Sequence, residues 1–319
     1  MCSHDNHLYA VAVHGGSGHY SRNQFSQQER QAYRTGLERA LRAAEAVLKT
    51  GGAALDAVQS AVAALEDDAL FNAGCGAVLN AGGIAELDAA IMDGTTLKAG
   101  AVAGMKTTRN PVRAARAVME HSPHVFLHGS DADAFASRQG LTQVDNAYFV
   151  TVARELQLAE AQARGETFSI SKFGTVGAVA RDRLGNIAAA TSTGGMTNKL
   201  PGRVSDSAVI GAGVYASRHG CAVAGSGHGE FFIRLAVGKD ISGRIEYGHQ
   251  TLADAANHVI HTSLASLGGE GGVIAIDARG TIVIAMNTAG MFRGVLKESG
   301  EPETGIYADE ALSRSPASL

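Results

Sequence analysis

Tryptophan is absent from this chain of 319 residues, and there are only 5 prolines and 3 cysteines. Cys2, Cys75 and Cys221 are an odd number and lie far apart, so we expect no disulfide framework and a reducing, cytoplasmic location. There is no block of Lys or Arg, and the net charge is −4, which makes nucleic acid and anionic membranes poor partners. No apolar run reaches the roughly 18 residues that a membrane helix needs, and residues 1–7 lack a signal-peptide pattern.

Glycine and apolar residues are abundant instead. The chain is 45 % hydrophobic and holds 40 glycines, so it can bury a large core as one large or two ordinary domains. The glycines follow no period, which excludes a collagen-like or low-complexity chain.

The elements predicted from the pattern separate into helical runs and strand pairs. Ser26 and Glu29 form a capping box for a helix to about Lys49, and Asn110 with Pro111 begins another helix. Further helices are expected near 53–65, 131–138, 153–163, 229–238 and 252–267. Strands are expected near 8–13, 208–213, 221–224, 273–277 and 281–286, with a flexible segment at 160–172 and a frayed tail after Gly300. This clustering favours an α+β fold of packed sheets flanked by helices over alternating βαβ units.

One hairpin carries the most informative residues. The β-prone runs 175–180 and 187–193 flank a connector, 181–186, that contains Asp, Gly and Asn. A turn centred there pairs residues whose numbers sum to roughly 367–368, so Thr175 lies opposite Ser192 or Thr193. A threonine at a strand end is ordinarily only a good strand residue, and the neighbouring motifs argue against that interpretation here.

A threonine freed at a chain start can act as a nucleophile. Its own α-amine, with a pKa of about 7.7–8, can take the hydroxyl proton. Gly174 precedes Thr175 and lowers the steric cost of a strained, cleavable bond. Cleavage between them would remove the need for a separate His or Lys base.

Arg203 and Asp206 follow a Pro-Gly turn three residues apart. An arginine fork fits a carboxylate and an aspartate accepts from an ammonium group, so the pair fits the α-amino-acid end of a substrate. A solvated salt bridge is the alternative.

The glycine-rich segment 225–230 precedes a predicted helix and offers N–H groups and the Ser226 hydroxyl to an oxyanion. A phosphate cradle and a plain tight turn are the alternatives, and no Gly-Lys-Ser/Thr follows to support a P-loop. The segment 211–216 matches a dinucleotide fingerprint only in isolation. His121, His124 and His128 have near-helical spacing but no carboxylate partner for a metal.

Taken together, these motifs resemble the plant-type asparaginase and isoaspartyl aminopeptidase family of N-terminal nucleophile hydrolases. The resemblance runs from His14-Gly-Gly-Ser-Gly18 to Asn287-Thr-Ala-Gly-Met291. It is strongest in Gly174-Thr-Val-Gly177 together with Thr193-Gly-Gly-Met-Thr-Asn-Lys-Leu-Pro-Gly-Arg203.

The resemblance implies a four-layer αββα sandwich that cuts itself between Gly174 and Thr175. Residues 1–174 would form an α subunit with a linker at about 160–174, and residues 175–319 a β subunit. The two would form one domain and pair as a dimer of heterodimers.

The resemblance also implies the roles of individual residues. Thr175 is the nucleophile and Thr193 assists it; Arg203 and Asp206 hold the substrate; Ser226 and Gly227 form the oxyanion hole, and Asn72 lines the site. No cofactor is implied for the chemistry. A structural sodium ion would bind main-chain carbonyls, here those of Leu65, Glu66, Asp68, Phe71, Ala73 and Cys75.

The implied activity is hydrolysis of L-asparagine to aspartate and ammonia, and of β-aspartyl (isoaspartyl) dipeptides. A glycosylasparaginase-like hydrolase, or a nonprocessing, glycine-rich small-molecule-binding protein, is the alternative. The chain departs from the family pattern at Ser226 and His228, where threonine is usual, and its linker is short. Gly174 stands where glycosylasparaginases and threonine aspartases usually carry Asp.

Overall fold

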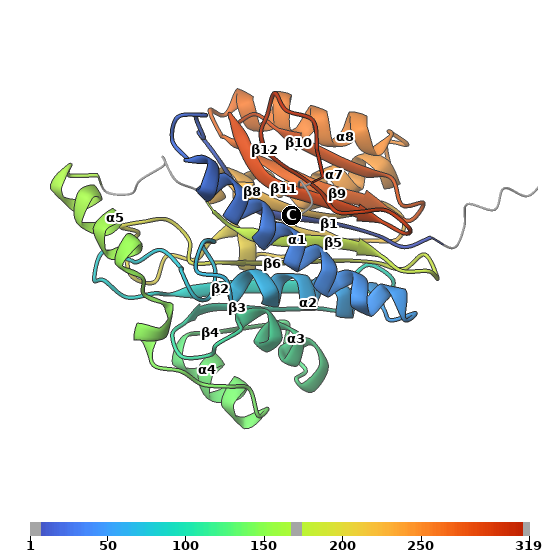
Figure 1. Cartoon of the computed structure of the whole chain (residues 1–319). Helices are drawn as coiled ribbons and strands as arrows, with labels where there is room; N and C mark the ends of the chain where they lie inside the picture. Colours follow the sequence, from blue (N-terminus) through green and yellow to red (C-terminus); the bar gives the residue numbers. More distant parts are fainter. Residues whose placement is uncertain (1–7, 167–173, 315–319) are drawn as a thin grey trace, which may run out of the picture.

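The computed structural model describes residues 8–166 and 174–314, which form a mixed fold of helices and two β-sheets (Figure 1). The strands are β1 (Ala10–Gly18), β2 (Leu87–Asp93), β3 (Ala99–Met105), β4 (Phe126–His128), β5 (Val176–Arg181), β6 (Ile187–Thr193), β7 (Val214–Ala216), β8 (Cys221–Gly227), β9 (Gly271–Asp277), β10 (Ile282–Met286), β11 (Gly290–Lys297) and β12 (Glu303–Tyr307). The helices are α1 (Gln27–Lys49), α2 (Ala54–Glu66), α3 (Pro111–His121), α4 (Gly129–Arg138), α5 (Val152–Ala163), α6 (Gly229–Leu235), α7 (Val237–Glu246) and α8 (Leu252–His258).

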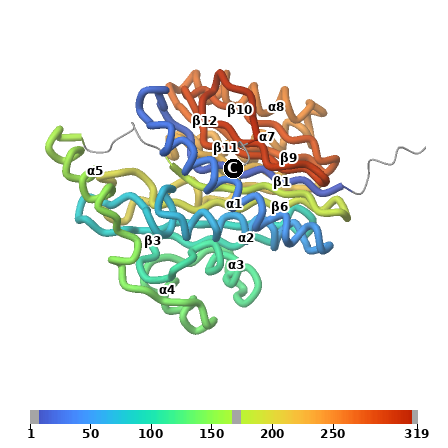
Figure 2. Tube along the Cα trace, viewed as in Figure 1, coloured from blue at the N-terminus to red at the C-terminus, as the bar shows by residue number. Residues whose placement is uncertain are grey.

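The larger sheet has the strand order β12-β11-β1-β5-β6-β2-β3-β4, and the smaller one β10-β9-β8-β7. The only parallel pair among these strands is β3 with β4. Figure 2 shows the red strands β11 and β12 beside the blue β1, so the first and last strands of the described chain lie in one sheet. The β5–β6 hairpin therefore lies inside the larger sheet, with β1 on one side and β2 on the other.

Both faces of the larger sheet are buried. Val11 and Val13 of β1 pack against α1 and α2, whereas Ala10 and Ala12 face residues of the smaller sheet such as Ile274. The other face of the smaller sheet packs on α7 and α8. Strands buried on two faces are apolar throughout rather than alternating, which explains the density of Ala, Gly and Val in β5 and β6.

Local signals predicted several elements correctly. Ser26 caps α1, and its capping box with Glu29 is present in both directions. The third helix begins at Pro111 as expected, although Asn110 makes no side-chain capping bond. The β5–β6 register pairs Val176 with Ser192, a sum of 368, which confirms the predicted hairpin.

Other predictions were wrong. β1 does not stop at His14 but continues to Gly18, with an irregularity between His14 and Gly16. The strand expected at 208–213 is replaced by a short 3₁₀ helix, Asp206–Ala208, and the strand β7. The helix expected at 229–238 breaks at Ala236, whose φ of 50° lies in the left-handed region and separates α6 from α7.

The C-terminal part is also more ordered than predicted. β11 was not predicted, and the tail that was expected to fray contains β12, which pairs with β11. The segment expected to be flexible at 160–172 begins inside α5, and residues 167–173 lie outside the described residues. None of the described helices combines the length and the apolar character that crossing a bilayer requires.

Candidate active site

Thr175 lies directly before β5, at the end of the hairpin where β6 finishes with Thr193. Continuing the register from Val176 and Ser192 puts Thr175 opposite Thr193. Both threonines are buried, as is Ser226 at the end of β8. The hairpin and the smaller sheet therefore bring three hydroxyl groups from distant parts of the chain to one buried place.

Thr175 has polar partners at both its side chain and its main chain. Ser207 Oγ donates to Thr175 Oγ1 at 3.2 Å, and the Thr175 N–H points at Ser226 Oγ at 3.4 Å. The Ser226 hydroxyl also accepts from the Ser17 N–H at 3.0 Å, while Ser17 Oγ donates to the Ser226 carbonyl at 2.6 Å. In both N–H contacts Ser226 Oγ is the acceptor, so its own proton remains available to a further group.

His14 adds a neutral imidazole to the same place. It pairs with Gly177 across β1 and β5, and a Cβ atom at Gly177 would lie 2.3 Å from His14 Nε2, so only glycine fits there. Burial lowers the pKa of His14 to about 3, and contact with the main chain of Thr175 offsets only part of that shift. The ring is therefore uncharged at neutral pH.

Asn72 and Thr193 fix the turn that follows β6. Thr193 Oγ1 accepts from the Gly195 N–H at 3.0 Å, and Asn72 Nδ2 donates to the Gly195 carbonyl at 2.8 Å. Asn72 Oδ1 accepts from the Val78 N–H at 2.8 Å, so the amide ties two loops together. Asn72 also lies beside Gly174, because a Cβ atom at Gly174 would lie 2.9 Å from Asn72 Cβ.

Arg203 and Asp206 converge without pairing with each other. A Cβ atom at Gly229 would lie 2.7 Å from Asp206 Oδ1 and 2.8 Å from Arg203 Nη2, so a larger residue there would displace one of these two side chains. Arg203 instead pairs with Glu230 through Nε and Nη2, each at 3.0 Å. The predicted alternative of a salt bridge is thus present for Arg203, but Glu230 is its partner.

Asp206 is a buried carboxylate that lacks a full set of partners. Its Oδ2 atom receives no hydrogen bond from the described residues. Burial raises the pKa of Asp206 to about 7, and the charge of Arg203 opposes that shift. A cationic group placed beside Asp206 would satisfy the oxygen and restore the ionised form.

The glycine-rich segment differs in one respect from its prediction. Ser226 and Gly227 belong to the end of β8 and not to a helix start, because α6 begins only at Gly229. Gly227 is confined by the Glu270 carbonyl, which would lie 2.4 Å from a Cβ atom at that position. The strand end, rather than a helix dipole, sets the direction of these groups.

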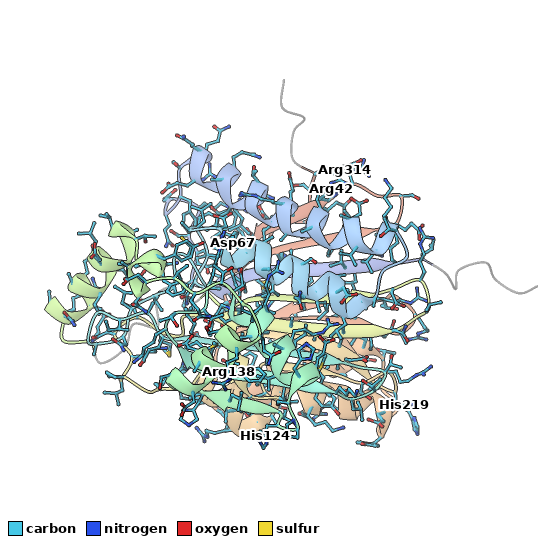
Figure 3. The ribbon with its side chains drawn as sticks, turned by 90° about the horizontal axis from the view of Figure 1, so that it is seen from below. Arg42, Asp67, His124, Arg138, His219 and Arg314 are labelled. Carbon is cyan, nitrogen blue, oxygen red and sulfur yellow. The ribbon has the colours of Figure 1, made fainter. Side chains whose placement is uncertain are left out.

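The loop that follows α2 is the segment predicted to bind sodium, and Asp67 marks its beginning in Figure 3. Gly74 and Gly76 have positive φ values of 50° and 95° and bend this loop back on itself. In the described part of the chain, the carbonyls of Phe71, Ala73 and Cys75 receive no hydrogen bond. The other three carbonyls already accept from main-chain N–H groups: Leu65 from Asp68, Glu66 from Cys75, and Asp68 from Phe71.

The remaining candidate motifs do not assemble. His121, His124 and His128 are exposed, with His124 at the surface in Figure 3, and the described residues contain no group of three or more His, Cys, Asp or Glu side chains arranged for a metal. The 211–216 segment is a turn followed by β7, not a strand–helix unit. Burial raises the pKa of Cys75, which argues against a reactive thiolate.

Sequence reasoning missed four neighbours of the site: Ser17, Ser207, Glu230 and the ring of His14. Each reaches the site through a contact between elements that are distant in sequence. All four lie in or beside segments that the sequence singled out, namely 14–18, 203–206 and 225–230, but nothing in those segments predicted these contacts.

The sequence model of the asparaginase family matches residues 7–306. The chain belongs to the asparaginase family. The matched range spans the hairpin, the 65–75 loop and both glycine-rich segments, so every residue discussed above lies within the family region.

Curated relatives in this family cover nearly the whole chain. The isoaspartyl peptidase of Salmonella typhimurium is 48% identical over 308 residues, which are 94% of this chain and 98% of the relative. The isoaspartyl peptidase of Escherichia coli is 47% identical over 309 residues, 94% of this chain and 96% of the relative. The human isoaspartyl peptidase/L-asparaginase is 39% identical over 303 residues, 94% of this chain and 96% of the relative.

Proposed function

We propose that this chain is an autoprocessing threonine hydrolase that cleaves L-asparagine and β-aspartyl dipeptides, with Thr175 as the nucleophile. The observation that carries the proposal is the surroundings of Thr175. Its hydroxyl faces Ser207, its N–H faces Ser226, and Gly174 before it touches Asn72. The names of the relatives, isoaspartyl peptidase and isoaspartyl peptidase/L-asparaginase, support the substrate class.

The reaction begins after the Gly174–Thr175 bond is cut. The freed α-amine of Thr175 takes the proton from its own Oγ1, which attacks the carbonyl carbon of the side-chain amide. The negative charge that develops on the carbonyl oxygen is stabilised by the Ser226 hydroxyl and the Gly227 N–H. The amine returns its proton to the leaving group, and water then releases aspartate from the ester.

Arg203 and Asp206 hold the amino-acid end of the substrate in this proposal. The α-carboxylate takes the guanidinium fork, and Glu230 yields that fork when the substrate binds. The α-ammonium lies beside Asp206 Oδ2, the oxygen that receives no hydrogen bond from the described residues. Thr193 and Asn72 hold the turn around Gly195 and so position the pocket.

The packing of helices on both sheets supports the finer architecture that we propose, a four-layer αββα sandwich of N-terminal nucleophile hydrolase type. Residues 1–174 and 175–319 become the α and β subunits of one domain and assemble as a dimer of heterodimers in the cytoplasm. The 65–75 loop fits a sodium ion, because three of its carbonyls have no other donor among the described residues. The ion would brace the loop that carries Asn72.

Electrophoresis under denaturing conditions and a substrate panel test the proposal together. Two fragments, the smaller beginning at Thr175, with hydrolysis of L-asparagine and of a β-aspartyl dipeptide, are expected. Hydrolysis of only glycosylated asparagine would favour the glycosylasparaginase alternative. A single intact band with no hydrolysis would favour the nonprocessing binding protein.

Arg203→Lys is expected to raise KM for L-asparagine by about tenfold or more, with autocleavage retained. Lysine keeps the charge but loses the planar fork, and lost substrate binding appears chiefly in KM. Steady-state kinetics of the cleaved variant measure this. Arg279→Lys is the matched control, because Arg279 also contacts one carboxylate, Asp277, through Nε and Nη2. An unchanged KM in Arg203→Lys would make Arg203 a structural residue.

Asp206→Asn is expected to raise the thermal unfolding midpoint, and to raise it more near pH 8 than near pH 5. Because burial raises the pKa of Asp206 to about 7, the folded chain holds this proton more tightly than the unfolded chain does. The stability that this proton supplies is present at low pH and is lost as pH rises through about 7. The asparagine side chain of the variant does not ionise, so the stability of the variant does not fall in this way as pH rises.

Calorimetry at both pH values, on wild type and variant, measures this difference. Asp131, whose side chain is exposed, supplies the control, since Asp131→Asn should shift the midpoint equally at both pH values. A gain for Asp206→Asn that does not grow with pH would contradict the raised pKa of Asp206.

A further inference from the structure

A cavity of about 350 Å³ reaches Gly174, and neither Arg203 nor Asp206 belongs to its lining. Gly174 and Asn72 belong to its lining, and so do Arg154 and Gln157 of α5. Figures 1 and 2 show α5 as a separate helix at one side of the molecule. None of the steps described above uses this cavity.

Arg154 brings a positive charge to the cavity without a matching acid. Its Nε donates to the Gly76 carbonyl at 2.6 Å and its Nη1 to Gln157 Oε1 at 2.9 Å. Among the described residues these two are its side-chain hydrogen bonds, and neither partner is a carboxylate. The two bonds that exist fix the guanidinium plane and leave its outer edge for another acceptor.

The electrostatics agree with a missing anion. Burial lowers the pKa of Arg154, the direction expected for a cation held without a counter-charge. An arginine stays protonated at neutral pH all the same. Glu29 also lines the cavity, but its carboxylate accepts from the Ser26 N–H in the α1 capping box.

Four aromatic rings also belong to the lining and form an aromatic wall. Tyr33 stacks on Phe292 with 4.0 Å between ring centroids, and Phe25 and Tyr20 pack against the same Phe292 ring at 5.7 Å and 4.6 Å. All four rings line the cavity. A ligand for this space therefore combines a carboxylate with an apolar side chain, which are the features of a free C-terminal amino acid.

The chemistry of the leaving group points to the same place. The α-amine of Thr175 must hand its proton to the departing nitrogen, so that nitrogen has to lie beside the amine. Before cleavage the peptide bond joins Gly174 to the Thr175 nitrogen that becomes this amine, and Gly174 lines the cavity. The group that leaves a dipeptide substrate thus departs toward Arg154, whereas L-asparagine releases only ammonia and has nothing to place there.

We propose, building on the function above, that this cavity is the leaving-group subsite: Arg154 binds the free α-carboxylate of the amino acid released from a β-aspartyl dipeptide, and the aromatic wall contacts its side chain. Arg154 is then a specificity residue for dipeptides over asparagine. The carboxylate that cleavage creates on Gly174 is a second source of the same chemistry, and the experiment separates the two.

The experiment uses the autocleaved protein, with both of its fragments present, and three substrates: β-aspartyl-leucine, its C-terminal amide, and L-asparagine. For wild type, amidation of the dipeptide is expected to raise KM on the order of tenfold to a hundredfold, as for loss of a hydrogen bond between charged groups. Arg154→Met is expected to raise KM for the free dipeptide by a similar factor and to leave its amide and L-asparagine nearly unchanged. Arg154→Lys should recover part of the loss.

Arg164→Met is the matched control, because Arg164 follows α5 but pairs with Glu160 and Glu166 on the surface. It should leave all three KM values unchanged. If Arg154→Met raised KM equally for L-asparagine and for the free dipeptide, the leaving-group subsite would be overturned. If it slowed autocleavage and left KM for the dipeptide unchanged, the partner of Arg154 would be Gly174 and not the substrate.

The comparison of the free dipeptide with its C-terminal amide uses only the wild-type protein, so this part of the test does not depend on how well the variants fold. Wild type that hydrolyses both dipeptides with the same KM refutes the subsite alone. Wild type that hydrolyses neither asparagine nor any β-aspartyl dipeptide refutes the proposed function instead.

Discussion

Replacing Thr175 with alanine is expected to leave the chain as one full-length band and to lower hydrolysis of both substrates by roughly 10⁴-fold or more. The hydroxyl is the proposed nucleophile for cleavage of the Gly174–Thr175 bond and for attack on the substrate. Without cleavage no α-amine forms, so the substitution removes the base as well as the nucleophile. Denaturing electrophoresis and hydrolysis of L-asparagine measure the two losses.

Two further variants separate chemistry from packing at this position. Thr175→Ser keeps the hydroxyl and is expected to cleave, although it loses a buried methyl group. Thr197→Ala removes another buried threonine hydroxyl, one that accepts from Gln157 Nε2 at 2.7 Å, and is expected to cleave normally. The assignment of Thr175 as the nucleophile would be wrong if Thr175→Ala still yielded two fragments. It would also be wrong if the smaller wild-type fragment began at another residue.

The parts of this fold that could be predicted are those that depend on neighbours along the chain. The capping box lies within a few residues of the start of α1 and predicted that start. The short connector between β5 and β6 likewise predicted the register of that hairpin. β11 depends instead on β1, near the other end of the chain, and β12 depends on β11. β11 mixes apolar residues with two glycines and an arginine, and β12 lies in a polar stretch, so neither has a clear strand pattern of its own.

The candidate site divides in the same way. Thr175, Thr193 and Ser226 stood out because glycines and hydroxyls cluster within short motifs, and the structure places all three in one buried region. The contact between Ser17 and Ser226 joins β1 to the smaller sheet, and no spacing in the sequence predicts it. The pairing of Arg203 with Glu230, rather than with Asp206, likewise follows from where α6 begins.

Ser226→Ala is expected to yield a cleaved protein whose kcat is lower by about 10²–10³-fold, with KM little changed. Ser226 Oγ accepts from the N–H groups of Ser17 and Thr175, at 3.0 Å and 3.4 Å. An oxygen that accepts twice directs its proton away from both donors, and in the proposed site that proton meets the developing oxyanion. Since the oxyanion exists only in the transition state, the loss should fall on kcat.

Ser17→Ala is the matched control for this loss. The Ser17 hydroxyl is equally buried and lies in the same contact, but it donates to the Ser226 carbonyl at 2.6 Å and not to the substrate. Its removal should disturb the position of Ser226 only slightly and cost less than about tenfold in kcat, in the range of one neutral hydrogen bond. If cleaved Ser226→Ala retained full kcat, or if Ser17→Ala lost as much, the Ser226 hydroxyl would serve the strand contact between β1 and β8, and the oxyanion donor would have to be sought elsewhere.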